Sequence, residues 1–214
     1  MIAPEGKVIL IPLLLLVIAG AGLNTWQPFS VLKWINLTLA LLTLFSLYFF
    51  RDPQRPPLKE KGLLSPADGK IVQIIEVEDT EMGKAKQISI FLSVFNVHSQ
   101  RVPETGKVIW KKYHPGKFLA AFNHKASLNN EQTEVLFETK DGERYKIKQI
   151  AGLIARRILN YMEVDNPVER GDRLGFIRFG SRVDIIIPHD FKIAVSLGDV
   201  VKGNQHIIGS FHED

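Results

Sequence analysis

Two long apolar runs open the chain, at residues 8–23 and 35–50, and neither contains a charged residue. Each would form a helix about 24 Å long, at about 1.5 Å per residue. The hydrocarbon core of a bilayer is about 30 Å thick, so a full crossing needs flanking residues or a thinned bilayer. The pattern predicts a membrane-associating helical hairpin over residues 1–50, which either spans the membrane or enters it as a re-entrant hairpin.

The charges beside the hairpin indicate its orientation. Lys7 precedes the first run, and a basic cluster follows the second: Arg51, Arg55, Lys59 and Lys61. Positive charge next to membrane helices is enriched on the cytoplasmic side. This predicts that both ends of the hairpin, and the domain that follows, lie at the cytoplasmic face of the cell membrane. Lys33, in the turn between the two runs, argues against this orientation.

A secretory signal is the alternative interpretation of the first run. Lys7 precedes an apolar stretch that ends in Ala19-Gly20-Ala21, and small residues in this position are typical of a cleavage site. Cleavage there would leave the second run in place as a membrane tether. Membrane attachment is therefore expected under either interpretation.

Beyond a linker rich in proline and charge at 51–61, the pattern becomes typical of β-strands. Apolar and alternating segments separated by Gly, Asp and Asn predict strands at 70–77, 87–94, 106–113, 133–139, 144–150, 174–179 and 183–188. One helix is predicted at 153–161. The fold class expected for residues 62–214 is a β-rich α+β domain with antiparallel sheets.

Composition excludes several classes of site. The chain has no cysteine, which excludes disulfides, a thiolate nucleophile and thiolate zinc sites. Its six histidines show no i, i+4 pairing, so no metal site is expected. The net charge of +4 suits an anionic membrane surface, whereas the absence of a basic tract interleaved with aromatics gives no indication of nucleic-acid binding.

The strand pattern restarts near the C-terminus at Gly180-Ser181, where glycine indicates a bend or bulge. The dipeptide alone fits an ordinary strand start. Together with four other segments, however, FGSR at 179–182 resembles the processing site of the short phosphatidylserine decarboxylases. These segments are FFRDPQR at 49–55, SPADGK at 65–70, FLSVFNVH at 91–98 and QIAGLIARR at 149–157, and the resemblance covers essentially the whole chain.

The resemblance implies that the chain cuts itself between Gly180 and Ser181. Ser181 would attack the preceding carbonyl and become a covalent pyruvoyl group, the only cofactor required, with neither pyridoxal phosphate nor a metal. This group would form a Schiff base with the substrate amine and release CO₂ from phosphatidylserine, or a related serine phospholipid, to give the ethanolamine lipid. The partners implied are the phospholipid, the membrane and the two fragments, 1–180 and 181–214, held as a heterodimer. The number of subunits stays open, a homo-oligomer included.

The resemblance also implies catalytic roles for His98 and Asp68. His98 would move protons in maturation or turnover, and Asp68 would orient its ring. Without the resemblance, His98 fits an ordinary residue at a strand end, and Asp68-Gly69 fits an ordinary turn. Longer relatives have a second histidine where this chain has Arg101, which leaves the maturation base open. His189 is the second candidate for that base.

Arg101, Arg156 and Arg157 are candidates for binding the lipid phosphate, since guanidinium groups bind phosphate oxygens in pairs. Adjacent residues of a helix point about 100° apart, so only one of Arg156 and Arg157 is expected to face the site.

A non-enzymatic carrier or adaptor module is the rival hypothesis. Segments 65–71 and 168–175 resemble each other in the manner of lipoyl and biotinyl half-motifs. Such a carrier needs an exposed lysine at a hairpin tip, for which Lys70 and Lys84 are the nearby candidates. Neither lies in the sequence setting that carriers use.

Overall fold

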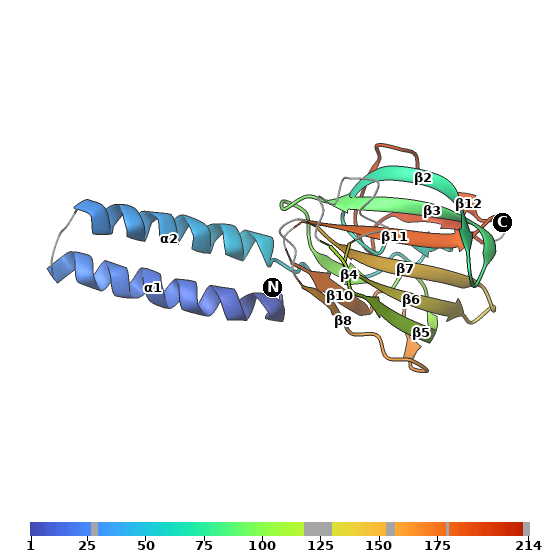
Figure 1. Cartoon of the computed structure of the whole chain (residues 1–214), viewed down its shortest axis with the longest axis horizontal. Coiled ribbons are helices and arrows are strands. Elements are labelled where there is room, and N and C mark those ends of the chain that lie inside the picture. The colour runs from blue at the N-terminus through green and yellow to red at the C-terminus, as the bar shows by residue number, and fades with distance from the viewer. Residues whose placement is uncertain (27–29, 118–129, 153–156, 179, 212–214) are drawn as a thin grey trace. The chain divides into compact units, whose positions relative to one another are not determined.

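The computed structural model describes residues 1–26, 30–117, 130–152, 157–178 and 180–211. The chain divides into two compact units, Met1–Gln54 and Arg55–Asp214. The division falls inside the segment predicted as a linker. The first unit holds the apolar runs, and the second holds the predicted strands (Figure 1).

The first unit is a pair of helices, as the apolar runs predict. A short 3₁₀ turn, Pro4–Gly6, leads into α1, Lys7–Trp26, and α2 is Ser30–Phe49. Both helices are long and apolar enough to cross a membrane, and most of their large apolar side chains are exposed. Side chains of this kind need an apolar environment, so the unit is suited to association with lipid. The N–H of Ala3 donates to the carbonyl of Phe50 at 2.7 Å and so joins the two ends of the unit.

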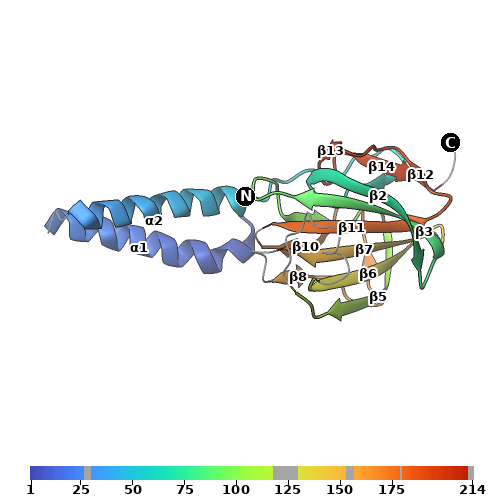
Figure 2. The ribbon, with the colours of Figure 1, turned by 45° about the horizontal axis from the view of Figure 1, so that its top comes forward.

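The second unit is built from antiparallel strands (Figure 1). The largest sheet has eight strands in the order β13-β2-β3-β11-β7-β6-β5-β9, and two smaller sheets have the orders β1-β14-β12 and β4-β10-β8. Figure 2 shows the large sheet curling, with β14 and β12 along one side of it. The strands are β1 Leu63–Leu64, β2 Gly69–Asp79, β3 Gly83–Leu92, β4 Ser99–Arg101, β5 Gly106–His114, β6 Gln132–Thr139, β7 Arg144–Ala151, β8 Ile158–Asn160, β9 Pro167–Val168, β10 Arg173–Ile177, β11 Ser181–Pro188, β12 Lys192–Ile193, β13 Val200–Val201 and β14 Ile207–Ser210.

This architecture confirms the predicted α+β class, and a strand forms in each of the seven predicted segments. The helix predicted at 153–161 is wrong at its C-terminal end, because Ile158–Asn160 is strand β8 and pairs with Ile177, Phe176 and Gly175 of β10. A free sheet edge supplied by a distant segment outweighs the local helical pattern. Residues 153–156 lie outside the described part of the chain.

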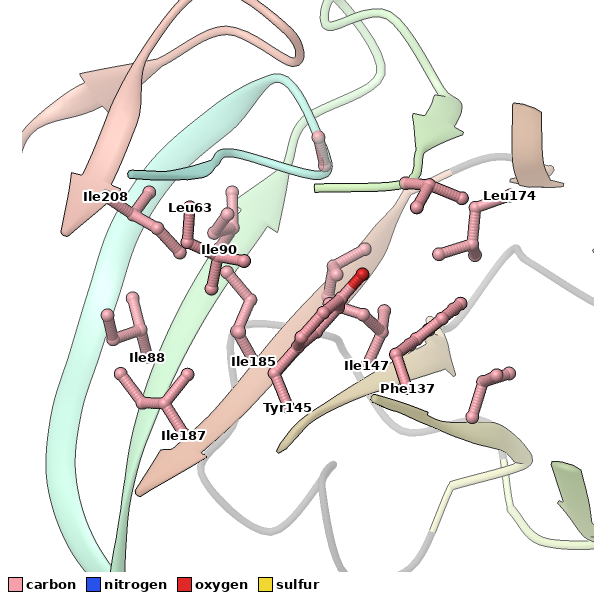
Figure 3. Packing of buried hydrophobic residues seen from close by; sticks show 14 of the residues in the cluster. Leu63, Ile88, Ile90, Phe137, Tyr145, Ile147, Leu174, Ile185, Ile187 and Ile208 are labelled. Carbon is pink, nitrogen blue, oxygen red and sulfur yellow. The ribbon is translucent and has the colours of Figure 1, made fainter. Parts of the chain in front are cut away.

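The hydrophobic core lies on one face of the large sheet. Alternate residues of the central strand β11, Val183, Ile185 and Ile187, are fully buried in it, as the period of two in a strand requires. Figure 3 shows Ile185 and Ile187 packed among side chains from neighbouring strands. Tyr145 stacks on Phe137 with ring centroids 4.9 Å apart, and its hydroxyl donates to the carbonyl of Glu104 at 3.0 Å. Burial raises the pKa of Tyr145 well above its ordinary value.

The opposite face of β11 is polar but also buried. Arg182 Nε donates to Asp184 Oδ1 at 2.6 Å, and the two side chains are 1% and 0% exposed. Further along the sheet, Lys146 Nζ lies 2.6 Å from Asp79 Oδ2, again with both groups buried. Burial disfavours the charged form of Asp79. Hydrogen bonds from Lys146 and two backbone N–H groups, together with the lysine charge, outweigh burial and lower the pKa of Asp79.

We expect Asp79→Asn to destabilise the domain by about 3 kcal/mol at pH 7, because Lys146 would stay buried without a partner charge. Since the folded pKa of Asp79 is lowered, its contribution to stability is present above the ordinary value of 3.8 and is lost as the pH falls through the folded value. The difference between variant and wild type should therefore shrink below pH 3.8. Urea unfolding of the detergent-solubilised chain at several pH values measures this. The exposed Asp141→Asn is the control, and an equal loss in both variants would contradict the expectation.

The second half of the predicted linker is tied to the β-domain. The N–H of Leu58 donates to the carbonyl of Asn204 at 3.1 Å, and the Asn204 side chain donates back to the carbonyl of Arg55 at 3.0 Å. Gln205 Nε2 donates to the carbonyl of Pro56 at 2.8 Å. These bonds hold the segment 55–58 against the loop between β13 and β14.

Candidate functional site

Ser181 is the first residue of β11, which lies between β3 and β7 in the large sheet. Its backbone is in register with Leu92 of β3 and Ala151 of β7, so it is held from both sides. The Ser181 side chain is fully buried, and its Oγ has no hydrogen-bond partner among the described residues. A buried hydroxyl without a partner costs about 1–3 kcal/mol. The backbone of Ser181 is therefore held on both sides, while its buried hydroxyl makes no hydrogen bond to a described residue.

Gly180 precedes this serine in a left-handed conformation, with φ +72°. The turn brings the chain abruptly into the central strand. Apart from its chain neighbours, no atom of the described residues lies within 4 Å of the position that a Cβ would occupy, so the restriction found at Gly180 is conformational and not steric. Residues with a side chain pay roughly 1–2 kcal/mol in this conformation.

If the chain cuts itself at this bond, as the resemblance implies, we expect Gly180→Ala to slow appearance of the fragment 181–214 about tenfold. An increase of about 1.4 kcal/mol in the activation free energy corresponds to one factor of ten in rate. Gly142→Ala is the matched control. Gly142 has φ +84° and equally open surroundings, but lies in the turn between β6 and β7. The Gly142→Ala variant should lose a similar amount of folding stability to Gly180→Ala but be cleaved at the wild-type rate. Equal cleavage rates in the two variants, measured by quantitative gel densitometry, would contradict a special role for Gly180.

His98 contacts the backbone of Gly180, the residue before Ser181. Its Nε2 accepts a hydrogen bond from the N–H of Gly180 at 3.3 Å, and its Nδ1 lies 3.0 Å from the carbonyl oxygen of Asn96. A carbonyl only accepts and an N–H only donates, so this pattern fits the neutral ring with the proton on Nδ1. The basic lone pair of Nε2 then points to the residue whose carbonyl Ser181 would attack.

A tight turn before β4 positions this histidine. Asn96 closes the turn, since its Oδ1 accepts from both the N–H and the hydroxyl of Ser93, at 2.9 and 2.8 Å. His98 itself is fully buried, and its ring lies 6.4 Å from that of Phe176 in β10. Buried and hydrogen-bonded on both nitrogens, the imidazole has little freedom to turn.

The bonds found for Asp68 among the described residues go to groups other than His98. Its carboxylate accepts a bidentate pair from Arg55, at 2.5 Å from Nη1 and 3.0 Å from Nη2, and a third bond from the N–H of Gly203 at 2.9 Å. The planar guanidinium fits both carboxylate oxygens, so Asp68 is tied to Arg55 in this structure. Arg55 was not among the predicted site residues, although it lies in the 49–55 segment.

The predicted arginines are placed differently from one another. Arg156 lies outside the described residues. Arg157 is exposed, and its carbonyl accepts from the N–H of Arg178 at 3.3 Å just before β8. Arg101 is half-buried in β4 and lies directly opposite Arg173 of β10. The guanidinium of Arg173 also lies 5.8 Å from the centre of the Tyr161 ring.

His189, the alternative base, lies beyond the far end of β11. The strand runs from Ser181 to Pro188, about 25 Å at about 3.3 Å per residue. The His189 side chain is 52% exposed and lies 4.0 Å from Glu76. Of the two histidines, His98 contacts the backbone of Gly180, whereas His189 lies beyond the far end of β11.

Two other features of the described residues lie away from this bond. A cavity of about 560 Å³ is lined by Asp79, Trp110, His114 and Lys146 among others. Lys146 lies near the start of β7, whereas Ala151, the partner of Ser181, is its last residue. Within the described ranges, no group of three or more His, Cys, Asp or Glu side chains is arranged to hold a metal ion.

Comparisons with known proteins agree with the sequence motifs. The family model for phosphatidylserine decarboxylase matches residues 42–209. The phosphatidylserine decarboxylase proenzyme of Pelobacter propionicus is 45% identical over 182 residues, which cover 84% of this chain and 83% of the relative. The proenzyme of Cytophaga hutchinsonii is 46% identical, over 86% of this chain and 85% of the relative. The proenzyme of Syntrophus aciditrophicus is 45% identical, over 91% of this chain and 93% of the relative. None of these matches favours the carrier alternative. The chain belongs to the phosphatidylserine decarboxylase family.

Proposed function

We propose that this protein is a self-processing decarboxylase that converts phosphatidylserine, or a closely related serine phospholipid, to the ethanolamine lipid and CO₂. One observation carries the proposal: Ser181 presents a buried hydroxyl without a hydrogen-bond partner among the described residues, directly after a left-handed Gly180 whose N–H contacts the basic nitrogen of His98. A strand residue with only a packing role needs none of these three features.

The processing reaction needs only the residues at this bond and water. Ser181 Oγ attacks the carbonyl carbon of Gly180, the C–N bond breaks, and the freed nitrogen takes up a proton, which leaves an ester in place of the amide. His98 then removes the α-proton of Ser181, and the Cβ–O bond breaks to release the Gly180 carboxylate. The dehydroalanine that remains takes up water and releases ammonia, so that residue 181 becomes a pyruvoyl group.

The residues around Ser181 fit such a group. Residue 181 is fully buried in the middle of a sheet, which would shield a reactive ketone from water. The ketone would supply an electrophile for the substrate amine and an acceptor for the electron pair that departing CO₂ leaves behind. His98 is the group placed to hold and return a proton at this position.

Binding of the lipid phosphate falls to Arg101 in this proposal, with Arg173 opposite it as a second ligand. Both residues are half-buried, and a phosphate between them could accept hydrogen bonds from both guanidinium groups. Arg157, exposed before β8, is a third candidate. Asp68 in this scheme holds Arg55 and the loop at 65–69, and acts on the site only through their position.

We further propose that α1 and α2 cross the membrane and leave the catalytic domain at its cytoplasmic face. The helices have 20 residues each, about 30 Å at about 1.5 Å per residue, which matches the apolar thickness of a bilayer. Lys7 and Arg51, at the outer ends of the pair, support the orientation through the usual distribution of positive charge.

The proposal is tested with the purified full chain in phosphatidylserine vesicles. Intact mass spectrometry should find fragments 1–180 and 181–214, the second with a ketone at its N-terminus that borohydride reduces. Carboxyl-labelled phosphatidylserine should release labelled CO₂. Release of CO₂ by a chain that keeps an ordinary, uncut seryl residue at position 181 would overturn the proposal.

A further inference from the structure

We propose that Gln100, Gln149 and Asn160 form a buried relay of side-chain amides that positions His98 for the cleavage reaction. None of the three touches the Gly180–Ser181 bond, so they are positioning residues and not catalytic ones. The proposal rests on the function proposed above, in which His98 is the base at that bond.

The relay runs through three strands and ends on the backbone of the histidine. Asn160 Nδ2 donates to Gln149 Oε1 at 2.8 Å, and Gln149 Nε2 donates to Gln100 Oε1 at 2.9 Å. Gln100 Nε2 then donates to the backbone carbonyl of His98 at 2.7 Å. All three bonds run in the same direction, so each amide accepts from the previous one and donates to the next. Chains of this kind strengthen their members cooperatively.

The fold reserves space for this relay. Gly175 of β10 is in register with Gln100 of β4 on one side and Asn160 of β8 on the other. A Cβ on Gly175 would lie 2.5 Å from Gln149 Nε2 and 2.2 Å from the carbonyl oxygen of Leu159. The amide of Gln149 therefore occupies the space next to Gly175 that a side chain would fill. Any other residue at position 175 would displace this amide.

The relay is too deeply buried for a surface role. Gln100 and Gln149 are both 0% exposed. Burying two primary amides is unfavourable unless their polar atoms are paired, and apolar residues of similar size would avoid that cost. Gln149 also lies on the core face of the sheet, since it is in register with Val183, where its neighbours along the strand, Ile147 and Ala151, are apolar. Polar residues at these buried positions indicate a role other than packing.

The role that we assign to these amides is to hold His98 in position. The ring is fixed through Nδ1 and Nε2, but the segment carrying it lies just outside β4 and relies on bonds to its carbonyl. This carbonyl accepts from Gln100 at 2.7 Å and from the N–H of Ile177 at 3.4 Å, so the amide is the closer support. A misplacement of about 1 Å in a reacting group can cost about a hundredfold in rate.

Gln100→Leu tests the relay in the full chain, because it removes the amide but keeps an apolar side chain of similar size. We expect self-cleavage to slow at least tenfold. The matched control is Gln87→Leu, which removes another buried amide, one that bonds Ser89 on the opposite face of the sheet. It should cleave as the wild type does. Both substitutions are repeated in the Ser181→Ala background, where the melting temperature of the uncut chain reports folding.

Gln100→Glu provides a readout that a purely structural role would not move. Its carboxylate can accept from Gln149 but cannot donate to His98, whereas the protonated acid can do both. The cleavage rate of this variant, divided by the wild-type rate at the same pH, should rise as the pH is lowered from 8 to 5.5. His98, Arg101 and Arg173 are the titratable and charged groups on the adjoining segments and are present in both proteins, so dividing by the wild-type rate removes the pH dependence that does not arise from the new carboxylate. The same ratio for Gln100→Leu should stay flat.

Asn160→Asp covers the case in which Gln100→Leu does not fold. Asn160 is half-buried, and aspartate keeps the acceptor for the N–H of Met162 while losing the donor to Gln149. It should slow cleavage severalfold. A ratio for Gln100→Glu that does not change with pH, or wild-type cleavage in folded Gln100→Leu, would overturn the relay. Failure of the wild-type chain to cleave would instead overturn the proposed function.

Discussion

Ser181→Ala should abolish both processing and decarboxylation. Alanine keeps the backbone of β11 and its pairing with Leu92 and Ala151, but it removes the hydroxyl that is proposed to attack the carbonyl of Gly180. No fragment 181–214 should form, and no ketone should be detectable by hydroxylamine or borohydride. Because the hydroxyl it removes is buried without a partner, the substitution should also stabilise the uncut chain slightly, by roughly 1 kcal/mol. This gain distinguishes loss of chemistry from loss of fold.

Ser196→Ala is the control for this result. Ser196 is exposed and lies in the same fragment, between β12 and β13. The control should yield both fragments and wild-type CO₂ release from phosphatidylserine vesicles. Detection of the 181–214 fragment in Ser181→Ala would show that another group cuts the chain.

His98→Ala is expected to slow processing by a factor of about 10²–10⁴, the usual contribution of a general base. The N–H of Gly180 would lose its acceptor at the same time, which loosens the bond to be cut. Pulse-labelled chain followed over days on denaturing gels measures the residual rate. His189→Ala, which alters an exposed histidine at the far end of β11, should process normally.

Turnover by the His98→Ala variant can be separated from its maturation. The fraction of chains that does mature is titrated through its ketone, and CO₂ release is expressed per ketone. A low rate per ketone assigns His98 to both steps, whereas a normal rate confines it to maturation. Rapid processing of His98→Ala, with His189→Ala slow, would transfer the role of base to the other histidine.

The strands were predictable because their signal is local. Alternation of apolar residues along segments such as 183–188 follows directly from the sequence and fixes which face meets the core. Short strands such as β4 and β8 carry no such signal. Ile158–Asn160 becomes a strand only because β10, which is distant in sequence, offers an edge to it. Local pattern predicted a helix there, and tertiary pairing decided otherwise.

The candidate site divides in the same way. Gly180, Ser181 and His98 could be predicted because their residue types and order resemble a known family. The partner of Asp68 could not, because Arg55 reaches it only through the folding of the 55–58 segment onto Asn204. The amides at 100, 149 and 160 gave no signal either, since an isolated glutamine in a strand is indistinguishable from a surface residue until its burial is known.

The central place of β11 has a consequence for the lifetime of the processed enzyme. The piece beginning at residue 181 would supply β11, a central strand of the eight-stranded sheet, and also β13 and β14, which pair with β2 and β1 of the other piece. Pulling it out would break two complete ladders and strip the core of Val183, Ile185 and Ile187. If the chain is cut at this position as proposed, dilution should not separate the two pieces, and their dissociation should coincide with unfolding of the whole domain.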